Sequence, residues 1–250
     1  MSLILAISTS SKIASVSLVK SGSMLAEPMT HEEKSHTASL MPMIDELFSS
    51  FAITCDDIDC FAVDTGPGSF TGVRIGVATA NGMALGANKP VIGINSLLAL
   101  RYQQLEISPV VTMIDAHNEN VYAAIYFSKH ATLAPCAMTI DELIEKMPKG
   151  ALCIGDGAAA YQQRILEAHP SAKFAIDDNG LVHASCVGLA AWHMIEEDKS
   201  LLTGGSMFAF PTYLKLSQAE RVREEQREEE ECETEEDIHE AETDGGNKDE

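Results

Sequence analysis

The sequence predicts a mixed α/β fold, because stretches with the periodicity of strands alternate with stretches that have the periodicity of helices. Apolar and polar residues alternate through residues 14–19, as in a half-buried strand. Residues 40–51 carry apolar side chains every three or four positions, as in an amphipathic helix. Residues 60–87 run from a short apolar segment through several glycines into a long segment of small residues, which indicates strand, tight loop and helix.

Residues 3–30 are expected to form three antiparallel strands. Residues 3–7 are apolar and β-prone, and the polar residues 8–12 that follow have the composition of a turn. A second turn is indicated at residues 20–23, because lysine, serine and glycine stand together there. Residues 24–30 are therefore the candidate third strand.

The helix expected next has a broad apolar face. Its apolar residues follow the spacing i, i+3, i+4, i+7, i+8 and i+11; they are Leu40, Met43, Ile44, Leu47, Phe48 and Phe51. Pro42 is compatible with the first turn of a helix and would kink a helix that began earlier. We therefore expect a start near Thr37 or an irregular first turn.

The central feature of the chain is F-A-V-D-T-G-P-G-S-F-T-G-V-R-I-G, residues 61–76. Glycine permits positive φ angles and a close backbone approach, and proline stiffens a turn; the residues concerned are Gly66, Pro67, Gly68, Gly72 and Gly76. By general rules this loop, which lies at a helix N-terminus, could either bind an anion or serve only as a structural turn. The motifs of a P-loop, a dinucleotide fingerprint and a G-x-S-x-G elbow are all incomplete.

The second helix is expected over residues 70–87. Gly72, Gly76, Ala80 and Ala84 recur every four residues, so they would form a shallow groove that lets another helix approach closely. A helix that is apolar nearly all round should be covered on both sides. From the pattern alone, a large intramolecular core or a partner chain could supply the cover.

The rest of the chain is expected to repeat this plan in outline. A strand at residues 91–94 and a helix at 96–104 end the first lobe near residues 106–109. The elements expected in the second lobe are strands at 110–114, 121–127 and 151–154 and helices at 141–147, 158–169 and 184–197.

The motif G-P-G-S-F-T-G-V-R-I-G resembles the hallmark of the TsaB (YeaZ) family, which belongs to bacterial biosynthesis of threonylcarbamoyladenosine in tRNA. Further matching segments follow in order: I-L-A-I-S-T-S at 4–10, Pro42, I-D-A-H-N-E-N-V-Y at 114–122 and P-T-Y-L-K at 211–215. The resemblance implies an α/β fold of two ribonuclease-H-like lobes of the actin, Hsp70 and sugar-kinase (ASKHA) superfamily, with the second lobe shortened. We expect the lobes at 1–106 and 107–216, with a tail at 217–250.

The resemblance also implies a non-catalytic subunit rather than an enzyme. Such a subunit forms a heterodimer with a TsaD-like threonylcarbamoyltransferase and recruits a TsaE-like ATPase, and it contacts tRNA only through the complex. In the family the first two helices form the dimer surface, and a homodimer through the same surface is a competing state. The implied interface residues are Leu40, Met43, Ile44, Leu47, Val73, Arg74, Val77, Ala80, Asn81 and Ala84.

ATP hydrolysis or phosphotransfer is an alternative that the residues support less well. Relatives of the fold, and most TsaB-like proteins, place an aspartate at the end of the first strand, where this chain has Ser8. A hydroxyl is a poor substitute for a carboxylate that organises Mg²⁺. Asp64 ends a later strand but has no acidic companion in the first lobe's turn. Asp115 and Asp156 end strands of the second lobe, so a weak ATP or ADP site at a subunit interface stays open.

Metal catalysis and nucleophilic catalysis find less support still in the residues. The paralogue TsaD carries a histidine pair after the strand that corresponds to residues 91–94, where this chain has G-I-N-S-L-L-A-L. His31 and His36 would lie on different helix faces, and His183 and His193 are isolated, so a metalloprotease-like hydrolase lacks ligands. Because no cysteine or serine stands in a nucleophile motif either, we expect no catalytic, cofactor-binding or metal-binding residue.

Composition favours a cytoplasmic protein that does not bind RNA alone. The net charge is −21, and both residues 217–250 and the remainder of the chain are acidic, which repels phosphate backbones. The six cysteines lack paired spacing, as is usual in a reducing compartment. No apolar run reaches membrane-spanning length, and the N-terminus does not resemble a signal peptide. The acidic run at 228–250 is expected to be disordered.

Overall fold

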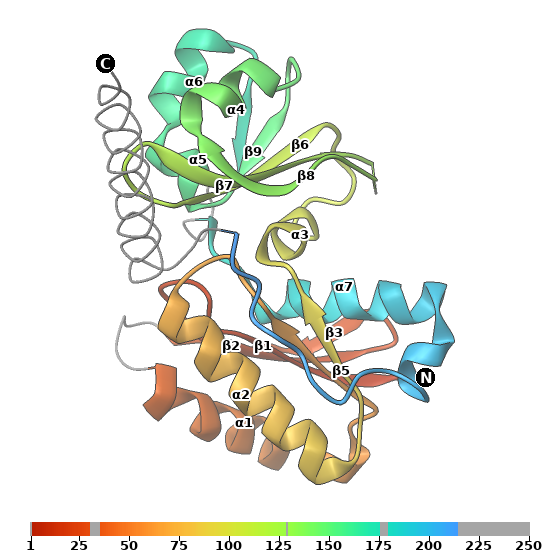
Figure 1. Ribbon diagram of the computed structural model, residues 1–250. Helices are drawn as coiled ribbons and strands as arrows, with labels where there is room; N and C mark the ends of the chain where they lie inside the picture. Colours follow the sequence, from red (N-terminus) through yellow and green to blue (C-terminus); the bar gives the residue numbers. More distant parts are fainter. Residues whose placement is uncertain (1, 31–35, 129, 176–179, 215–250) are drawn as a thin grey trace, which may run out of the picture. The chain divides into compact units, whose positions relative to one another are not determined.

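Five strands form the first sheet in the order β3-β2-β1-β4-β5 (Figure 1). They are β1 (Leu3–Ser8), β2 (Ser15–Lys20), β3 (Ser23–Ala26), β4 (Cys60–Asp64) and β5 (Val91–Ile94). β1 and β2 pair antiparallel, as do β2 and β3, whereas β4 and β5 continue the sheet in parallel with β1. The carboxyl ends of the three parallel strands therefore meet at one edge of the sheet.

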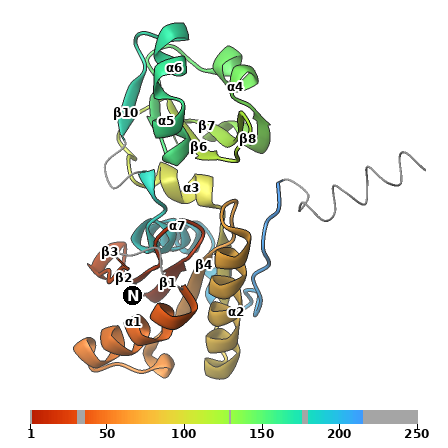
Figure 2. The ribbon, with the colours of Figure 1, turned by 90° about the vertical axis from the view of Figure 1, so that its left-hand side faces the viewer.

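Helices cover both faces of this sheet, because its central strands are apolar on both sides. Leu5 and Ile7 face α1 (His36–Phe51) and α2 (Phe70–Ala87), which lie side by side in Figures 1 and 2. Ile4 and Ala6 face α7 (Ala184–Glu197) on the opposite side. The result is a three-layer arrangement of two helices, a sheet and one helix.

The second sheet repeats the topology of the first, with order β10-β9-β6-β7-β8. Its strands are β6 (Val110–Asp115), β7 (Asn120–Phe127), β8 (His130–Thr139), β9 (Leu152–Ile154) and β10 (Lys173–Ala175). The helices α4 (Ile140–Lys146), α5 (Asp156–Ala160) and α6 (Gln162–Ala168) pack on one face. On the other face, α3 (Ser96–Arg101) belongs to the core that also contains α7 and the first sheet. Short 3₁₀ turns lie at Cys55–Asp57 and Lys199–Leu202.

This computed structural model describes residues 2–30, 36–128, 130–175 and 180–214. They belong to one compact unit, Met1–Leu214. The predictions for His31 and for the acidic tail at 217–250 lie outside the described residues. The predicted lobe boundary near residue 106 stays a prediction, and α7, which follows the second sheet in the chain, packs on the first.

The predicted mixed α/β fold with two lobes of like topology is confirmed, and most element bounds agree closely. α2, β5 and α7 begin and end at the predicted residues, and α1 begins one residue before Thr37 with Pro42 inside it. The helix predicted at 158–169 is instead two short helices that meet at Tyr161. The sequence patterns do not predict β8 or β10. Both are edge strands of the second sheet, and an edge strand tolerates a short length, as in β10, or a proline, as at Pro135 in β8.

Candidate functional site

The glycine-rich loop joins β4 to α2 and brings α2 against the turn between β1 and β2. Gly66 has φ +95°, a conformation that side chains with a Cβ rarely adopt. A Cβ on Gly72 would overlap the carbonyl oxygen of Thr9, so only glycine allows this close approach. Ser69 caps α2 by accepting a hydrogen bond from the Gly72 amide (3.2 Å), and its own amide donates to the Ser10 carbonyl (2.7 Å). The loop thus fixes α2 to the β1–β2 turn.

Asp64 lies directly before this loop and is fully buried. Hydroxyl groups of Ser8, Ser10 and Ser96 surround its carboxyl group, together with the amide of Gly66. Ser8 ends β1, and its hydroxyl contacts Asp64 and the Val182 carbonyl. Ser8 is 0% exposed, so it presents no group to solvent or to a ligand.

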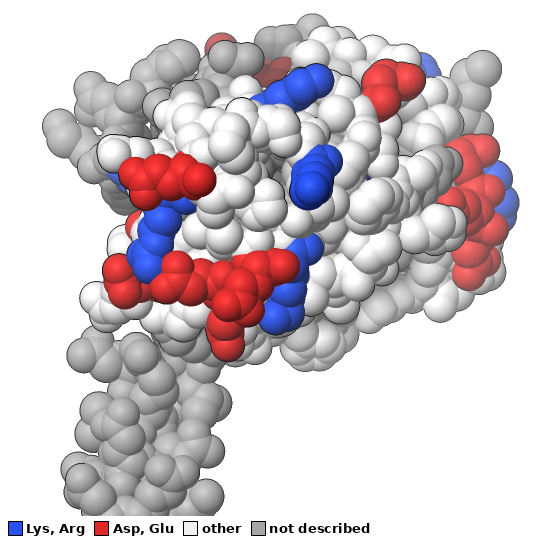
Figure 3. All heavy atoms as spheres, turned by 90° about the horizontal axis from the view of Figure 1, so that it is seen from above, with Lys and Arg blue, Asp and Glu red and all other residues white. Residues whose placement is uncertain are grey.

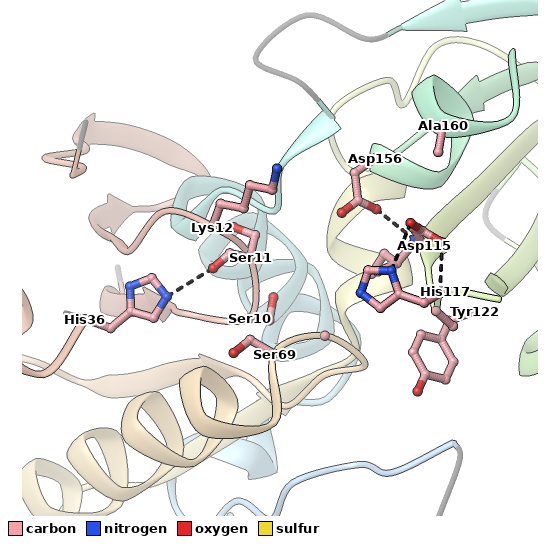
Figure 4. A pocket seen from close by; sticks show the side chains of 13 residues that line it. Ser10, Ser11, Lys12, His36, Ser69, Asp115, His117, Tyr122, Asp156 and Ala160 are labelled. Carbon is pink, nitrogen blue, oxygen red and sulfur yellow. Dashed lines mark hydrogen bonds and ion pairs between the residues drawn. The ribbon is translucent and has the colours of Figure 1, made fainter. Parts of the chain in front are cut away.

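A cavity of about 680 Å³ opens beside the β1–β2 turn (Figure 4). On one side it is lined by Ser10, Ser11, Lys12, His36, Gly68 and Ser69. Residues from the second sheet and α5 line the other side; the labelled ones are Asp115, His117, Tyr122, Asp156 and Ala160. Hydroxyls and an ammonium group therefore face two carboxyl groups across the cavity.

The two carboxyl groups of the cavity are held by the chain itself. The Asp115 amide donates to Asp156 Oδ1 (2.9 Å), and the His117 amide donates to Asp115 Oδ1 (2.9 Å). Burial raises the pKa of Asp156, and the neighbouring Asp115 charge adds to this effect. In the described part of the chain, no three His, Cys, Asp or Glu side chains gather as a metal site would require.

The histidines considered as ligands have other contacts. The His36 ring nitrogen Nε2 lies 3.1 Å from the Ser11 carbonyl. His183 pairs with Glu27, with 3.5 Å between Nδ1 and Oε2. The His193 ring lies against Trp192 and Tyr102, with centroid separations of 4.7 and 5.4 Å. These contacts place the three rings in different parts of the fold.

Eight of the ten residues predicted as a partner interface are buried in the chain's own core, and their role at an interface stays a prediction. These eight belong to the cluster between the first sheet and the helices α1 and α2, and none is more than 9% exposed; they are Leu40, Met43, Ile44, Leu47, Val73, Val77, Ala80 and Ala84. The groove of small residues along Gly72 and Gly76 likewise faces Thr9 and Ile7 of the same chain. The first sheet covers the side of the two helices on which these eight residues lie.

The outer faces of α1 and α2 carry a second set of small and apolar residues. On α2, Ala78, Gly82 and Gly86 are exposed, and a Cβ added to either glycine would meet no atom within 4 Å. Leu85 of α2 is 57% exposed, and Met41 of α1 is 52% exposed. A stripe of small residues at four-residue spacing thus exists on the outer side of α2 as well.

Arg74 and Asn81 differ from the buried eight, because they bind residues 206–214, which we call the C-terminal strap. The Asn81 side chain exchanges two hydrogen bonds with the backbone of Ala209, at 2.9 and 2.8 Å. Arg74 Nε donates to the Tyr213 hydroxyl (2.8 Å), and its guanidinium lies 3.8 Å from the centroid of the Phe70 ring. Both residues position the strap within the chain, and Arg74 is in addition exposed.

No helix in the described part of the chain is long and apolar enough to cross a membrane. The five cysteines within that part are free thiols. Three of them are buried, and burial raises the pKa of each of these thiols to about 12; they are Cys60, Cys153 and Cys186.

Comparison with known sequences gives a consistent result. Residues 28–221 match the family model described as TsaD, tRNA N6-adenosine threonylcarbamoyltransferase. The tRNA threonylcarbamoyladenosine biosynthesis protein TsaB of Haemophilus influenzae is 32% identical over 180 residues, which cover 64% of this chain and 74% of that protein. The protein of the same name from Bacillus subtilis is 27% identical over 231 residues, which cover 87% of this chain and 96% of that protein.

Solved structures agree with the sequence matches. YeaZ from Pseudomonas aeruginosa superposes with a TM-score of 0.67 at 24% identity, over 86% of this chain and all of that one. The activator of 2-hydroxyisocaproyl-CoA dehydratase from Clostridium difficile, solved with bound ADPNP, superposes with a TM-score of 0.53 at 9% identity, over 79% of this chain and 97% of that one. These likenesses show that the chain has the fold of these two proteins. Sequence and fold agree, and the chain belongs to the TsaB (YeaZ) family.

Proposed function

We propose that this chain acts in the biosynthesis of threonylcarbamoyladenosine in tRNA, as a non-catalytic subunit that binds a TsaD-like threonylcarbamoyltransferase. Relatives named for this pathway support the pathway assignment. The observation that carries the binding role is the outer face of α1 and α2, where small residues alternate with exposed apolar side chains. A partner helix can approach α2 closely at Gly82 and Gly86, where the backbone is open to solvent.

The interface proposed here is the outer helix surface, defined by Met41, Ala78, Gly82, Leu85 and Gly86. Because a homodimer would bury the same residues, self-association competes with the heterodimer. The chain would also help to recruit a TsaE-like ATPase. The chain contributes little to RNA binding itself, since its net charge is −21. On the face seen in Figure 3, separate Lys and Arg side chains lie among acidic clusters and form no continuous basic surface.

The binding test uses Gly82→Arg. The added side chain would project from the outer face of α2 into open space, and arginine favours a helix more than glycine does, so the fold is expected to be kept. We expect Gly82→Arg to abolish co-elution with the purified TsaD-like enzyme of the same organism in gel filtration. Ala159→Arg on α5, which is also exposed, is the matched control and should bind normally. Unchanged binding by Gly82→Arg would place the interface elsewhere.

A second candidate function is weak binding of ATP or ADP in the cavity, which the polar lining with Lys12, Asp115 and Asp156 favours. Calorimetric titration of the isolated chain with ADP and Mg²⁺ tests it. Heat of binding that disappears in Lys12→Ala would support a nucleotide site, and steady release of phosphate from ATP would contradict the non-catalytic role. No heat in either protein at millimolar ADP would exclude the site.

A further inference from the structure

The carboxyl group of Asp64 has polar neighbours at both oxygens. Ser96 Oγ (2.5 Å) and the Gly66 amide (3.0 Å) donate hydrogen bonds to Oδ1. Ser8 Oγ lies 3.1 Å from Oδ2, and Ser10 Oγ is hydrogen-bonded to the same oxygen. These four contacts are made by hydroxyl and amide groups, and Asp64 itself is 0% exposed. Isolated charges are very unfavourable in such a place.

The Ser8 hydroxyl indicates where the protons lie, because it has one hydrogen atom and two oxygen neighbours. Its second neighbour is the carbonyl oxygen of Val182, 3.0 Å away. A carbonyl oxygen can only accept, so the contact with Val182 is a hydrogen bond only when the Ser8 hydrogen points to it. With the hydrogen there, an ionised Asp64 would turn its Oδ2 toward the lone pairs of Ser8 Oγ with no hydrogen between them, in a fully buried site.

The Val182 carbonyl is held in place by the residues that follow it. The Ala184 amide donates to Ser15 Oγ (2.9 Å), and the Ser185 amide donates to the Glu27 carboxylate (2.7 Å). Both acceptors belong to the first lobe, on β2 and just after β3. These bonds hold the segment before α7 against the sheet, with the Val182 carbonyl beside Ser8.

We propose that Asp64 is a neutral carboxylic acid in the folded protein at neutral pH. With the proton on Oδ2, Asp64 donates to Ser8 Oγ, and Ser8 donates to the Val182 carbonyl. Oδ2 still accepts from Ser10, while Oδ1 accepts from Ser96 and the Gly66 amide, so every donor and acceptor in the network is paired.

Burial of Asp64 favours the neutral form of its carboxyl group, as the hydrogen-bond geometry does. Burial raises the pKa of Asp64, although hydrogen bonds from the hydroxyls of Ser8, Ser10 and Ser96 and from the Gly66 amide act against that rise. The other titratable groups of this region are Lys12 and His36 beside the β1–β2 turn, Asp115 and Asp156 across the cavity, and His183 after Val182.

The neutral acid connects chain segments that are distant in sequence. It contacts the end of β1, the loop before α2 and the start of α3, and through Ser8 it reaches the segment before α7. Ser10 also lines the cavity, so the same network fixes one of the cavity walls. Asp64 is thus a positioning residue whose proton is part of the structure.

The test compares urea unfolding of the full chain with that of Asp64→Asn. Asparagine matches the shape of the neutral acid, can donate to Ser8 and does not titrate. Above the ordinary aspartate pKa of about 3.9, the folding constant of the wild type should fall relative to that of Asp64→Asn by about tenfold per pH unit, until the folded pKa is reached. A ratio that is constant, or that rises with pH, would overturn the proposal.

Carbon-13 NMR of the aspartate-labelled wild-type chain gives an answer even if Asp64→Asn does not fold. At neutral pH we expect one carboxyl resonance at the chemical shift of a protonated acid. Ser96→Ala removes a donor to Oδ1, so it should move this resonance and assign it to Asp64. If every aspartate resonance has the shift of an ionised group, Asp64 is a carboxylate and the Ser8 hydrogen is shared between two acceptors.

Discussion

Asn81→Ala tests whether the C-terminal strap is held by α2. The substitution removes both hydrogen bonds between the Asn81 side chain and the Ala209 backbone. Each such bond contributes about 0.5–1.5 kcal/mol, so the strap should be less stable by about 1–3 kcal/mol. This corresponds to an opening constant for the strap that rises by between about 5-fold and about 150-fold.

Amide hydrogen exchange measures this opening directly. The Thr212 amide donates to the Thr65 carbonyl (2.7 Å), a bond that Asn81→Ala leaves intact, so its exchange rate reports the opening of the strap. Gly82→Ala is the matched control on the same helix, where an added Cβ meets no atom within 4 Å. If Thr212 exchanges at the same rate in Asn81→Ala and wild type, the two bonds do not hold the strap.

Burial and charge lead to three more predictions. Ala80→Arg should unfold the chain, in contrast to Gly82→Arg, because it places a cation where the native residue is 0% exposed; circular dichroism distinguishes the two variants. Desolvation raises the pKa of Glu27, but hydrogen bonds from His183 and Ser185 outweigh it and hold the pKa below its ordinary value. Glu27 therefore contributes stability above the ordinary glutamate pKa, and this contribution is lost as pH falls through the lower folded pKa; Glu27→Gln should flatten that part of a stability profile measured by urea unfolding. The buried thiols should not react with a thiol reagent at about pH 8 until the chain unfolds, and early labelling would contradict their burial; they are Cys60, Cys153 and Cys186.

Local signals account for the parts of the fold that the sequence predicts well. The glycine loop marks the end of β4 and the start of α2, because a turn with positive φ and a helix cap are both encoded in adjacent residues. The bounds of α7 are likewise predicted from the helical pattern of its own residues. By contrast, the position of α7 on the first sheet depends on contacts with residues far away in the chain, which periodicity does not reveal.

The face of α2 that meets the sheet could not be predicted from its pattern. Small residues repeat every four positions along both Gly72–Gly76–Ala80–Ala84 and Ala78–Gly82–Gly86, so both stripes are compatible with close helix packing. The sheet and the β1–β2 turn select the first stripe, as the contact between Gly72 and Thr9 shows. The second stripe stays exposed.

The Asp64 network was also beyond the sequence patterns. Ser8, Ser10 and Ser96 are common residues that are separated by up to 88 positions, and no motif connects them. The available signal was positional: the serines lie at the ends of β1 and β5, Asp64 ends β4, and the ends of these parallel strands meet at one edge of the sheet.

Reconstitution of the tRNA modification tests most directly whether this chain supports a partner enzyme through the outer faces of α1 and α2. The purified TsaD-like enzyme would be given its TsaE-like ATPase, tRNA and threonylcarbamoyl donor, and modified adenosine would be measured by mass spectrometry. We expect modification with the wild-type chain and with Ala159→Arg, and none without the chain or with Gly82→Arg. Full modification in the absence of this chain would contradict the proposed role.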